Sequence, residues 1–377
     1  MSADTDVDSP ARSASETATQ NGFAPPQRSH TDEPRRERSG GESDPPEQPA
    51  HHATAAEFFA GMGLMRAGLE RVGVSTVFAN DNDSTKAALY RANWGDDVLT
   101  VDDIRNLTGD DIPDADIATA SFPCVDMSLA GNLAGLDGEQ SGLITEFCRI
   151  LAEMGARRPR AVIVENVPGF KTVNEGRDFA QVVEMLRSLG YSVDSVVVNA
   201  SAFVPQSRAR VFLLGTLGPR PALPEPPNQA GPLRLVDIAG ADGDWWPPDR
   251  RDSFLDSLSP LQRKRVDAWR SDSRIRCLGA YRRTRDGRAV WEVRSDEIAG
   301  ALRTTKGGSS RQALVRVGQG NFDVRWMGVD EYARLQGAAN LHYDVVSERQ
   351  AMFALGDAVC VPVIEWLGHN WLTRLAA

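Results

Sequence analysis

Residues 54–73 read "TAAEFFAGMGLMRAGLERVG". The first seven residues are an apolar run of strand length, and a turn with Gly61 and Gly63 then leads into a helical pattern. A glycine turn between a strand and a helix lets a ligand approach the backbone at the helix N-terminus. The spacing is not the strict G-x-G-x-x-G of dinucleotide sites, so it indicates a nucleoside cofactor more than a pyrophosphate. A simple tight turn is the alternative.

The alternation of strand and helix continues to residue 217. Continuous apolar runs predict strands, and amphipathic runs between them predict helices, the second of which has Ser84 as its expected N-cap. Such strands are typical of a parallel sheet that helices cover on both faces, so the sequence predicts an open α/β domain. The later predicted strands are 75–81, 115–121, 161–167, 192–200 and 210–217, and the later helices are 84–93, 143–155 and 179–190.

We assign the α/β domain to 53–217, and both ends of the chain lie outside it. Residues 1–52 are Ser, Pro, Glu, Asp and Arg with almost nothing apolar, so they cannot bury enough surface to offset ordering entropy. We expect a disordered tail there. Residues 346–377 contain the amphipathic pattern of a C-terminal helix.

The region 218–345 lacks the α/β pattern. It opens with a Pro-rich stretch, 218–232, which is typical of a linker. The rest is irregular and arginine-rich, and "YRRTRDGRAVWEVR", residues 281–294, predicts a hairpin that turns at Asp286-Gly287. We therefore expect a small, irregular, β-rich domain.

The charge of the chain is unevenly distributed. The formal net charge is −10, which by itself disfavours a polyanionic partner. Residues 1–50 hold ten acidic residues and five arginines, whereas residues 263–316 hold fifteen Lys and Arg against six Asp and Glu. A basic patch on an acidic protein indicates a localised nucleic-acid site, and a solvated charged face is the alternative.

The four cysteines, Cys124, Cys148, Cys277 and Cys360, have spacings that indicate neither a disulfide framework nor a zinc site. We therefore expect a reducing, cytoplasmic compartment and no bound metal. No apolar run predicts a membrane span, and no secretory segment is evident, so we expect no membrane association.

Polar and reactive side chains stand where predicted strands end. The strand 75–81 ends at Asp81, and either Asp81 or Asp83 can take the hydroxyl pair of a ribose. Cys124 lies in the loop after the strand 115–121, where ligands bind in open α/β sheets. An exposed thiol there is a candidate nucleophile, and an inert small residue is the alternative.

Two further groups of polar side chains stand at the ends of predicted strands, one where a strand ends and one where a strand begins. Glu165 and Asn166 stand near the end of a buried strand, where a half-buried carboxyl group can hold or share a proton; capping of the next turn is the alternative. Arg208 and Arg210 share one face at a strand entrance, so their guanidiniums can bind a carboxylate, a carbonyl oxygen or a phosphate. Exposed strand-edge charges are the alternative there.

The order of these features is more specific than any one of them. A glycine turn, an acidic strand end, a Pro-Cys loop, Glu-Asn-Val and Q-x-R-x-R follow one another along the chain. In this order the chain resembles the cytosine-5 DNA methyltransferase family, over about 54–217 and again over about 298–372. The resemblance implies a Rossmann-like sheet for S-adenosylmethionine-dependent methyl transfer, with helices on both faces. It also implies a target-recognition domain at 218–345.

Residues can be carried over from the family motifs position by position. The closing motifs match "VDEYARLQG", 329–337, and "LGDAVCVPV", 355–363, the second of which is expected to pack beside the glycine turn. Three positions depart from the family pattern: Val125 stands for glutamine, Leu64 for glycine and Asp357 for asparagine. The implied catalytic residues are Cys124, Glu165, Arg208 and Arg210, and the implied cofactor-binding residues are Phe59, Gly61, Gly63, Asp81, Asn82, Asp103, Ile104, Pro123, Leu143 and Asp357.

The resemblance also implies a reaction. The thiolate of Cys124 adds to carbon 6 of cytosine, which makes carbon 5 nucleophilic toward the sulfonium methyl group. Glu165 acts at ring nitrogen 3, and Arg210 holds the carbonyl oxygen with Arg208 in support. The target base must leave the duplex, and the glycine-rich loop 131–142 is expected to close over it.

The implied partner is double-stranded DNA. We expect contacts from Ser128 and from the hairpin arginines Arg282, Arg283 and Arg285, some to phosphates and some to bases. We further expect a monomer on DNA, in a prokaryotic cytoplasm and associated with the nucleoid. A cognate restriction endonuclease is the expected functional partner.

Three alternatives remain open from the sequence. An RNA methyltransferase, for example one acting on tRNA, shares the architecture. A nicotinamide or flavin oxidoreductase with a reactive cysteine is disfavoured by the glycine spacing and by the Glu-Asn-Val and Q-x-R-x-R motifs. A catalytically silent DNA-binding relative is disfavoured by the presence of Cys124, Glu165 and Arg210.

Overall fold

The computed structural model describes residues 52–123, 142–240, 243–285, 287–304 and 311–375. The described residues belong to one compact unit. Almost all of the predicted tail, residues 1–51, lies outside them, and so do Cys124, Ser128 and all but the last residue of the loop 131–142.

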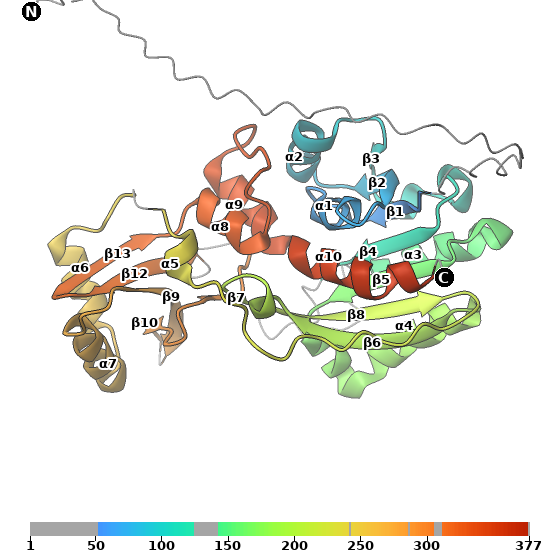
Figure 1. Ribbon diagram of the computed structural model, residues 1–377. Coiled ribbons are helices and arrows are strands. Elements are labelled where there is room, and N and C mark those ends of the chain that lie inside the picture. Colours follow the sequence, from blue (N-terminus) through green and yellow to red (C-terminus); the bar gives the residue numbers. More distant parts are fainter. Residues whose placement is uncertain (1–51, 124–141, 241–242, 286, 305–310, 376–377) are drawn as a thin grey trace, which may run out of the picture. The chain divides into compact units, whose positions relative to one another are not determined.

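A seven-stranded sheet forms the larger part of the fold (Figure 1). Its strand order is β3-β2-β1-β4-β5-β8-β6, and the first five strands in this order run parallel to one another. β8 is antiparallel to both of its neighbours, because the short connection after β6 returns the chain between β5 and β6. The α/β fold predicted from the sequence is confirmed. The strands are β1 (Thr54–Phe58), β2 (Ser75–Asp81), β3 (Leu99–Val101), β4 (Ile117–Ser121), β5 (Ala161–Asn166), β6 (Ser192–Asn199) and β8 (Ala209–Thr216).

Helices cover both faces of this sheet, as Figure 1 shows. Alternate residues along each strand point to opposite faces, so Ala161 and Ile163 pack in one core with α1 and α10, while Val162 and Val164 pack in another with α3 and α4. These helices are α1 (Leu64–Glu70), α3 (Leu143–Glu153), α4 (Arg177–Ser188) and α10 (Val361–Asn370).

The helix α2 (Ser84–Trp94) follows β2 and corrects one prediction. Its N-cap is Asp83, not Ser84. The Asp83 carboxylate accepts hydrogen bonds from the backbone N–H groups of Thr85 and Lys86, at 2.8 and 3.1 Å. A carboxylate at this place satisfies two of the unpaired N–H groups of the first turn, and Ser84 already has helical backbone.

A second, four-stranded sheet follows the Pro-rich stretch. Its order is β10-β9-β12-β13, and all its neighbours are antiparallel. The predicted hairpin is confirmed: Arg285 pairs with Arg288 across the turn, whose residue Asp286 lies outside the described part. One face packs in a core of its own with two helices. The elements are β9 (Arg276–Arg285), β10 (Arg288–Val293), β12 (Ala313–Gly318), β13 (Asn321–Trp326), α6 (Pro248–Asp256) and α7 (Pro260–Arg270).

Short elements connect the two sheets, and a buried glutamine holds several of them together. The side chain of Gln206 donates to the carbonyl oxygen of Leu335 at 2.7 Å and accepts from the N–H of Leu302 at 3.0 Å. The predicted domain boundaries near residues 217 and 345 remain predictions. The elements here are α5 (Leu235–Ile238), β7 (Gln206–Ser207), which pairs with β11 (Ala299–Gly300), α8 (Val329–Gln336) and α9 (Glu348–Asp357).

By length and composition alone, one described segment, Glu348–Leu375, could cross a membrane. It is divided into α9, α10 and the 3₁₀ turn η8 (Leu372–Leu375). In this fold 67% of its apolar window is buried inside the protein, as is usual for core helices.

Candidate active site

Several described residues that are predicted to carry the chemistry lie along one edge of the seven-stranded sheet. β1, β2, β4 and β5 are parallel, so their carboxyl ends meet at this edge. Asp81 ends β2, Glu165 lies at the end of β5, and Pro123 follows β4 by two residues. The arrangement brings the predicted cofactor turn and the predicted catalytic carboxyl group to a common edge.

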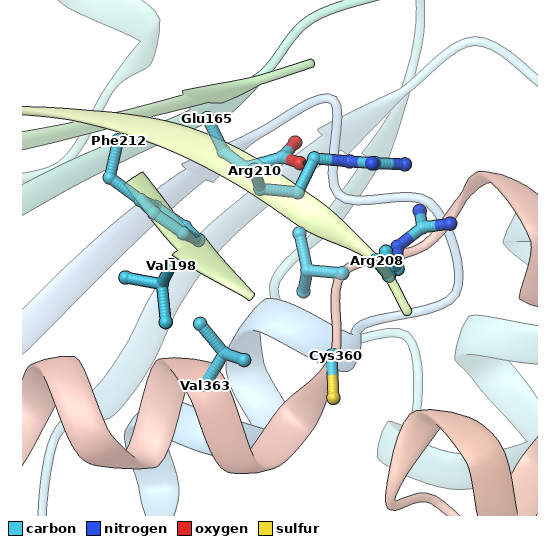
Figure 2. A pocket seen from close by; sticks show the side chains of 8 residues that line it. Glu165, Val198, Arg208, Arg210, Phe212, Cys360 and Val363 are labelled. Carbon is cyan, nitrogen blue, oxygen red and sulfur yellow. Dashed lines mark ion pairs between the residues drawn. The ribbon is translucent and has the colours of Figure 1, made fainter. Parts of the chain in front are cut away.

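Glu165 and Arg210 form a buried ion pair. Oε1 of Glu165 lies 2.9 Å from Nε of Arg210, and the two side chains are 9% and 17% exposed. Arg210 reaches Glu165 because β8 runs antiparallel beside β5. Burial raises the pKa of Glu165 above its ordinary value, and the charge of Arg210 opposes this rise. Figure 2 shows both groups lining a small cavity.

Asn166 fixes the chain next to the Pro-Cys dipeptide. Its amide nitrogen donates to the carbonyl oxygen of Phe122 at 3.2 Å, and its amide oxygen accepts from the N–H of Val167 at 2.8 Å. Phe122 is itself buried, with its ring edge-on to Phe170. The backbone entering Pro123 is therefore held against the end of β5. Cys124 is the next residue and lies outside the described part.

Arg208 and Arg210 have different partners. The guanidinium of Arg208 is buried and donates to three backbone carbonyl oxygens, those of Leu302 at 2.9 Å, Gly356 at 3.2 Å and Ala358 at 2.6 Å. Burial lowers the pKa of Arg208 to about 9, so the group stays charged at neutral pH. Arg208 thus binds the closing motif to the strand that carries Arg210.

The glycine turn has a strained backbone. Phe59, Gly61 and Gly63 have φ angles of 56°, 59° and 84°, in the left-handed region that favours glycine. A non-glycine residue in this region is typical of functional sites. A Cβ atom on Gly63 would lie 2.4 Å from Nε1 of Trp94, so a side chain there would clash.

The amides of this turn are already used within the protein. The N–H of Ala60 donates to the carbonyl oxygen of Asn80, that of Gly61 to Oδ2 of Asp81 at 2.8 Å, and that of Gly63 back to Ala60. These three amides therefore do not form a phosphate cradle. The turn fits a nucleoside cofactor better than a pyrophosphate, in agreement with the glycine spacing.

The other predicted cofactor residues lie in different environments. Asp81 is buried, and burial raises its pKa although Lys86 and two amides oppose the rise. Asn82 is exposed, and Leu143 is the first, half-buried residue of α3. Asp103 caps the 3₁₀ turn η1 (Ile104–Asn106), and its carboxylate pairs with Arg105 at 2.6 Å, which the sequence did not indicate.

Lys86 lies among the predicted cofactor residues, although it was not predicted from the sequence. Its Nζ atom lies 2.5 Å from Oδ2 of Asp357, the predicted cofactor residue at the end of α9. Burial by itself lowers the pKa of Lys86, but the carboxylates of Asp357 and Asp81 raise it above its ordinary value. A lysine in the first turn of the helix after Asp81 was an available signal, because the chain has only four lysines.

Two of the predicted DNA-contacting arginines have described side chains. The guanidinium of Arg282 lies 5.7 Å from the ring centre of Trp291 and 5.8 Å from that of Trp326. Nε of Arg283 lies 3.2 Å from Oε2 of Glu292, and the Arg283 side chain is 57% exposed. Both arginines belong to β9, and their role in DNA binding remains a prediction.

Comparison with known proteins places this site in a family. The sequence profile of the C-5 cytosine-specific DNA methylases matches residues 53–372. The chain is 31% identical to the type II methyltransferase M.NgoBI of Neisseria gonorrhoeae, over 82% of this chain and 90% of that protein. It is 30% identical to the type II methyltransferase M.NlaX of Neisseria lactamica, over 85% of this chain and 96% of that protein.

A solved structure shares the fold. The methyltransferase EhMeth of Entamoeba histolytica superposes with a TM-score of 0.61, at 15% identity, over 86% of this chain and 99% of that one. The family match rules out the oxidoreductase alternative and favours DNA over RNA as the substrate. The chain therefore belongs to the C-5 cytosine-specific DNA methylase family and is a DNA cytosine-5 methyltransferase.

Proposed function

We propose that this DNA cytosine-5 methyltransferase uses S-adenosylmethionine as methyl donor and Cys124 as a covalent nucleophile. The observation that carries the proposal is the buried Glu165–Arg210 pair beside the chain that leads into Pro123 and Cys124. A carboxyl group and a guanidinium at this place suit the ring nitrogen 3 and the carbonyl oxygen of a cytosine.

The other cysteines support Cys124 as the nucleophile by elimination. Cys148, Cys277 and Cys360 are buried free thiols. Burial raises the pKa of Cys148 and of Cys360 to about 12, and it also raises that of Cys277. A protonated, buried thiol is a poor nucleophile. Cys124, which lies outside the described residues, follows Pro123, two residues after the end of β4.

The roles of the protein groups follow from the chemistry of cytosine. The Cys124 thiolate forms a bond to carbon 6, and Glu165 donates a proton or hydrogen bond to ring nitrogen 3, which relieves the negative charge that builds up there. Arg210 holds the carbonyl oxygen and orients Glu165 through their 2.9 Å contact. Once carbon 5 carries the methyl group, loss of its proton to a base breaks the carbon–sulfur bond, and Cys124 leaves as the thiolate.

S-adenosylmethionine supplies an electrophilic methyl group for carbon 5. The residues present fit this cofactor. The amides of Ala60, Gly61 and Gly63 already have partners within the protein, so they do not bind a phosphate, and Asp81 offers a carboxylate at the end of β2. The proposed cofactor residues are Phe59, Gly61, Gly63, Asp81, Asn82, Asp103, Ile104, Pro123, Leu143 and Asp357.

Arg208 acts in this proposal as a positioning residue. Its hydrogen bonds go to Leu302, Gly356 and Ala358, which are backbone groups of the protein itself. It supports the reaction by holding the closing motif in place against the strand of Arg210.

Duplex DNA binds, in this proposal, through the four-stranded sheet and its hairpin, with Arg282, Arg283 and Arg285 near the backbone or bases. Ser128 would contact DNA from the loop after Cys124, and the glycine-rich loop 131–142 would close over the flipped base. We propose a monomer acting in a prokaryotic cytoplasm, near the nucleoid, as the modification half of a type II restriction–modification pair.

One labelling experiment tests the donor and the substrate together. The wild-type protein is incubated with S-adenosylmethionine tritiated in its methyl group and with duplex DNA, tRNA or no nucleic acid, and the nucleosides are then separated. We expect label in 5-methylcytosine from DNA alone. Label in RNA, or in another base of DNA, would overturn the proposal.

A further inference from the structure

Lys86 joins three segments that surround the proposed cofactor site. It belongs to the first turn of α2, directly after β2, and its ammonium pairs with Asp357 at the end of α9. Its aliphatic stem passes beside the glycine turn, because a Cβ atom on Gly61 would lie 3.9 Å from Cδ of Lys86. The Lys86 side chain is 18% exposed and that of Asp357 is 40% exposed.

The pair is set among further acidic groups. Asp81 and Asp83 both act electrostatically on Lys86. Asp83 is engaged as the N-cap of α2, and Asp81 accepts from the N–H groups of Gly61 and Asp83. Lys86 is therefore a cation among three carboxylates at the place where the cofactor is expected.

Asp357 carries a charge where the family usually has an uncharged asparagine. An unpaired carboxylate at this position would add a negative charge near Asp81, at the proposed site of a cofactor that itself carries a carboxylate. The 2.5 Å contact with Lys86 neutralises that charge. The structure thus gives a physical reason why this substitution is compatible with cofactor binding.

We propose that Lys86 is a cofactor-positioning residue, coupled to Asp357, and that the pair does together what a neutral asparagine does alone. The inference rests on the proposed S-adenosylmethionine site. It makes Lys86 and Asp357 interdependent: removal of Lys86 leaves Asp357 as an uncompensated negative charge near Asp81, and removal of the Asp357 charge leaves Lys86 to pair with Asp81.

The two single variants should therefore both weaken cofactor binding. In Lys86→Met, the free Asp357 carboxylate repels the cofactor carboxylate. In Asp357→Asn, the free ammonium turns to Asp81 and competes with the ribose hydroxyls, even though the variant introduces the usual residue of the family. Coupled neighbours give interaction energies that correspond to about tenfold in affinity, so we expect each single variant to bind about tenfold more weakly.

The double variant Lys86→Met/Asp357→Asn should recover most of the affinity, to within about threefold of wild type, because both charges are gone. The measurement is the dissociation constant for S-adenosylhomocysteine by calorimetry, with the unfolding temperature of the ligand-free protein measured alongside. The control is Lys171→Met, an exposed lysine that donates to Ser195 and lies outside the proposed cofactor site.

The affinities and unfolding temperatures distinguish the coupling of Lys86 and Asp357 from the cofactor assignment itself. Two weakened single variants with a recovered double variant support the coupling, and Lys171→Met should bind as wild type does. Additive losses in the double variant, or lower unfolding temperatures with unchanged affinities, would overturn the inference while leaving the cofactor assignment intact. A wild-type protein that binds no S-adenosylhomocysteine would overturn the proposed cofactor, and the inference with it.

Discussion

Nε of Arg210 lies 2.9 Å from Oε1 of Glu165, and both side chains are largely buried at the carboxyl end of β5. Two opposing effects act on the carboxyl group. Burial raises its pKa, whereas the guanidinium stabilises its charged form. The proposed role of Glu165 at ring nitrogen 3 requires a carboxyl group that can hold a proton, and burial favours the protonated form.

Glu165→Gln should separate proton transfer from binding. The amide has nearly the same size and can donate a hydrogen bond, but it cannot transfer a proton. We expect the rate of methyl transfer to fall by about 10²-fold or more, which is the usual contribution of a positioned acid or base. Affinity for S-adenosylhomocysteine should not change. Single-turnover methylation and calorimetry measure the two quantities, and a wild-type rate would contradict the role of Glu165.

Arg208→Lys should destabilise the protein although it keeps the positive charge. Lysine has a single ammonium and cannot match the planar guanidinium that reaches three carbonyl oxygens. We expect the free energy of unfolding to fall by about 1–3 kcal/mol, since the variant cannot form all the hydrogen bonds that the charged group makes in the interior. Denaturant unfolding measures this. Arg187→Lys, at an exposed position on α4, is the matched control, and equal stability of both variants would argue against the positioning role.

Glu57 predicts a pH dependence of stability. It lies in β1 and is 2% exposed, and burial raises its pKa from the ordinary value of 4.5 to about 8. The folded protein therefore holds a proton that the unfolded chain releases near pH 4.5. The free energy of unfolding should fall as pH rises from about 4.5 to about 8, by about 1.4 kcal/mol for each unit of pKa difference.

Glu57→Gln should remove this fall, since glutamine does not ionise. Near pH 9 the variant should be more stable than wild type, and near pH 5 the two should be similar. Denaturant unfolding at both pH values measures the difference, with Glu184→Gln as a control at an exposed position on α4. Parallel pH profiles of wild type and Glu57→Gln would show that the carboxyl group is ionised in the fold.

The hairpin arginines predict a salt dependence of DNA binding. Replacing Arg282, Arg283 and Arg285 by alanine together should lower the slope of log affinity against log salt, by about 0.9 for each phosphate that these arginines neutralise in the wild-type protein. Affinity for S-adenosylhomocysteine should stay unchanged. The measurement is a salt titration on cognate and random duplexes, with Arg187→Ala as control. If affinity and slope are unchanged on both duplexes, the DNA binds elsewhere.

Local patterns in the sequence were sufficient for much of the fold. The glycine turn, the apolar strands and the hairpin of β9 and β10 depend on neighbouring residues, and the structure contains each of them. The N-cap of α2 was misplaced by one residue because Asp83 and Ser84 are both good caps, and only the hydrogen bonds of Asp83 distinguish them.

Contacts between distant parts of the chain were beyond such reasoning. The pairing of Lys86 with Asp357 joins residues 271 positions apart, and no local pattern specifies it. The separate partners of Arg208 and Arg210 likewise depend on where Leu302 and Ala358 lie in the fold. The motif order named the candidate residues and implied a supporting role for Arg208, but the three carbonyl oxygens that Arg208 binds could be identified only from the structure.

Covalent trapping tests the central claim most directly. Fluorine at carbon 5 of the target cytosine blocks the elimination that frees Cys124, so the adduct should persist. A duplex that carries 5-fluorocytosine at the methylated site, incubated with S-adenosylmethionine, should give a protein–DNA complex that survives denaturing electrophoresis. Cys124→Ser should give none. The absence of a complex with the wild-type protein at a site that it methylates, or an equal complex with Cys124→Ser, would contradict the account.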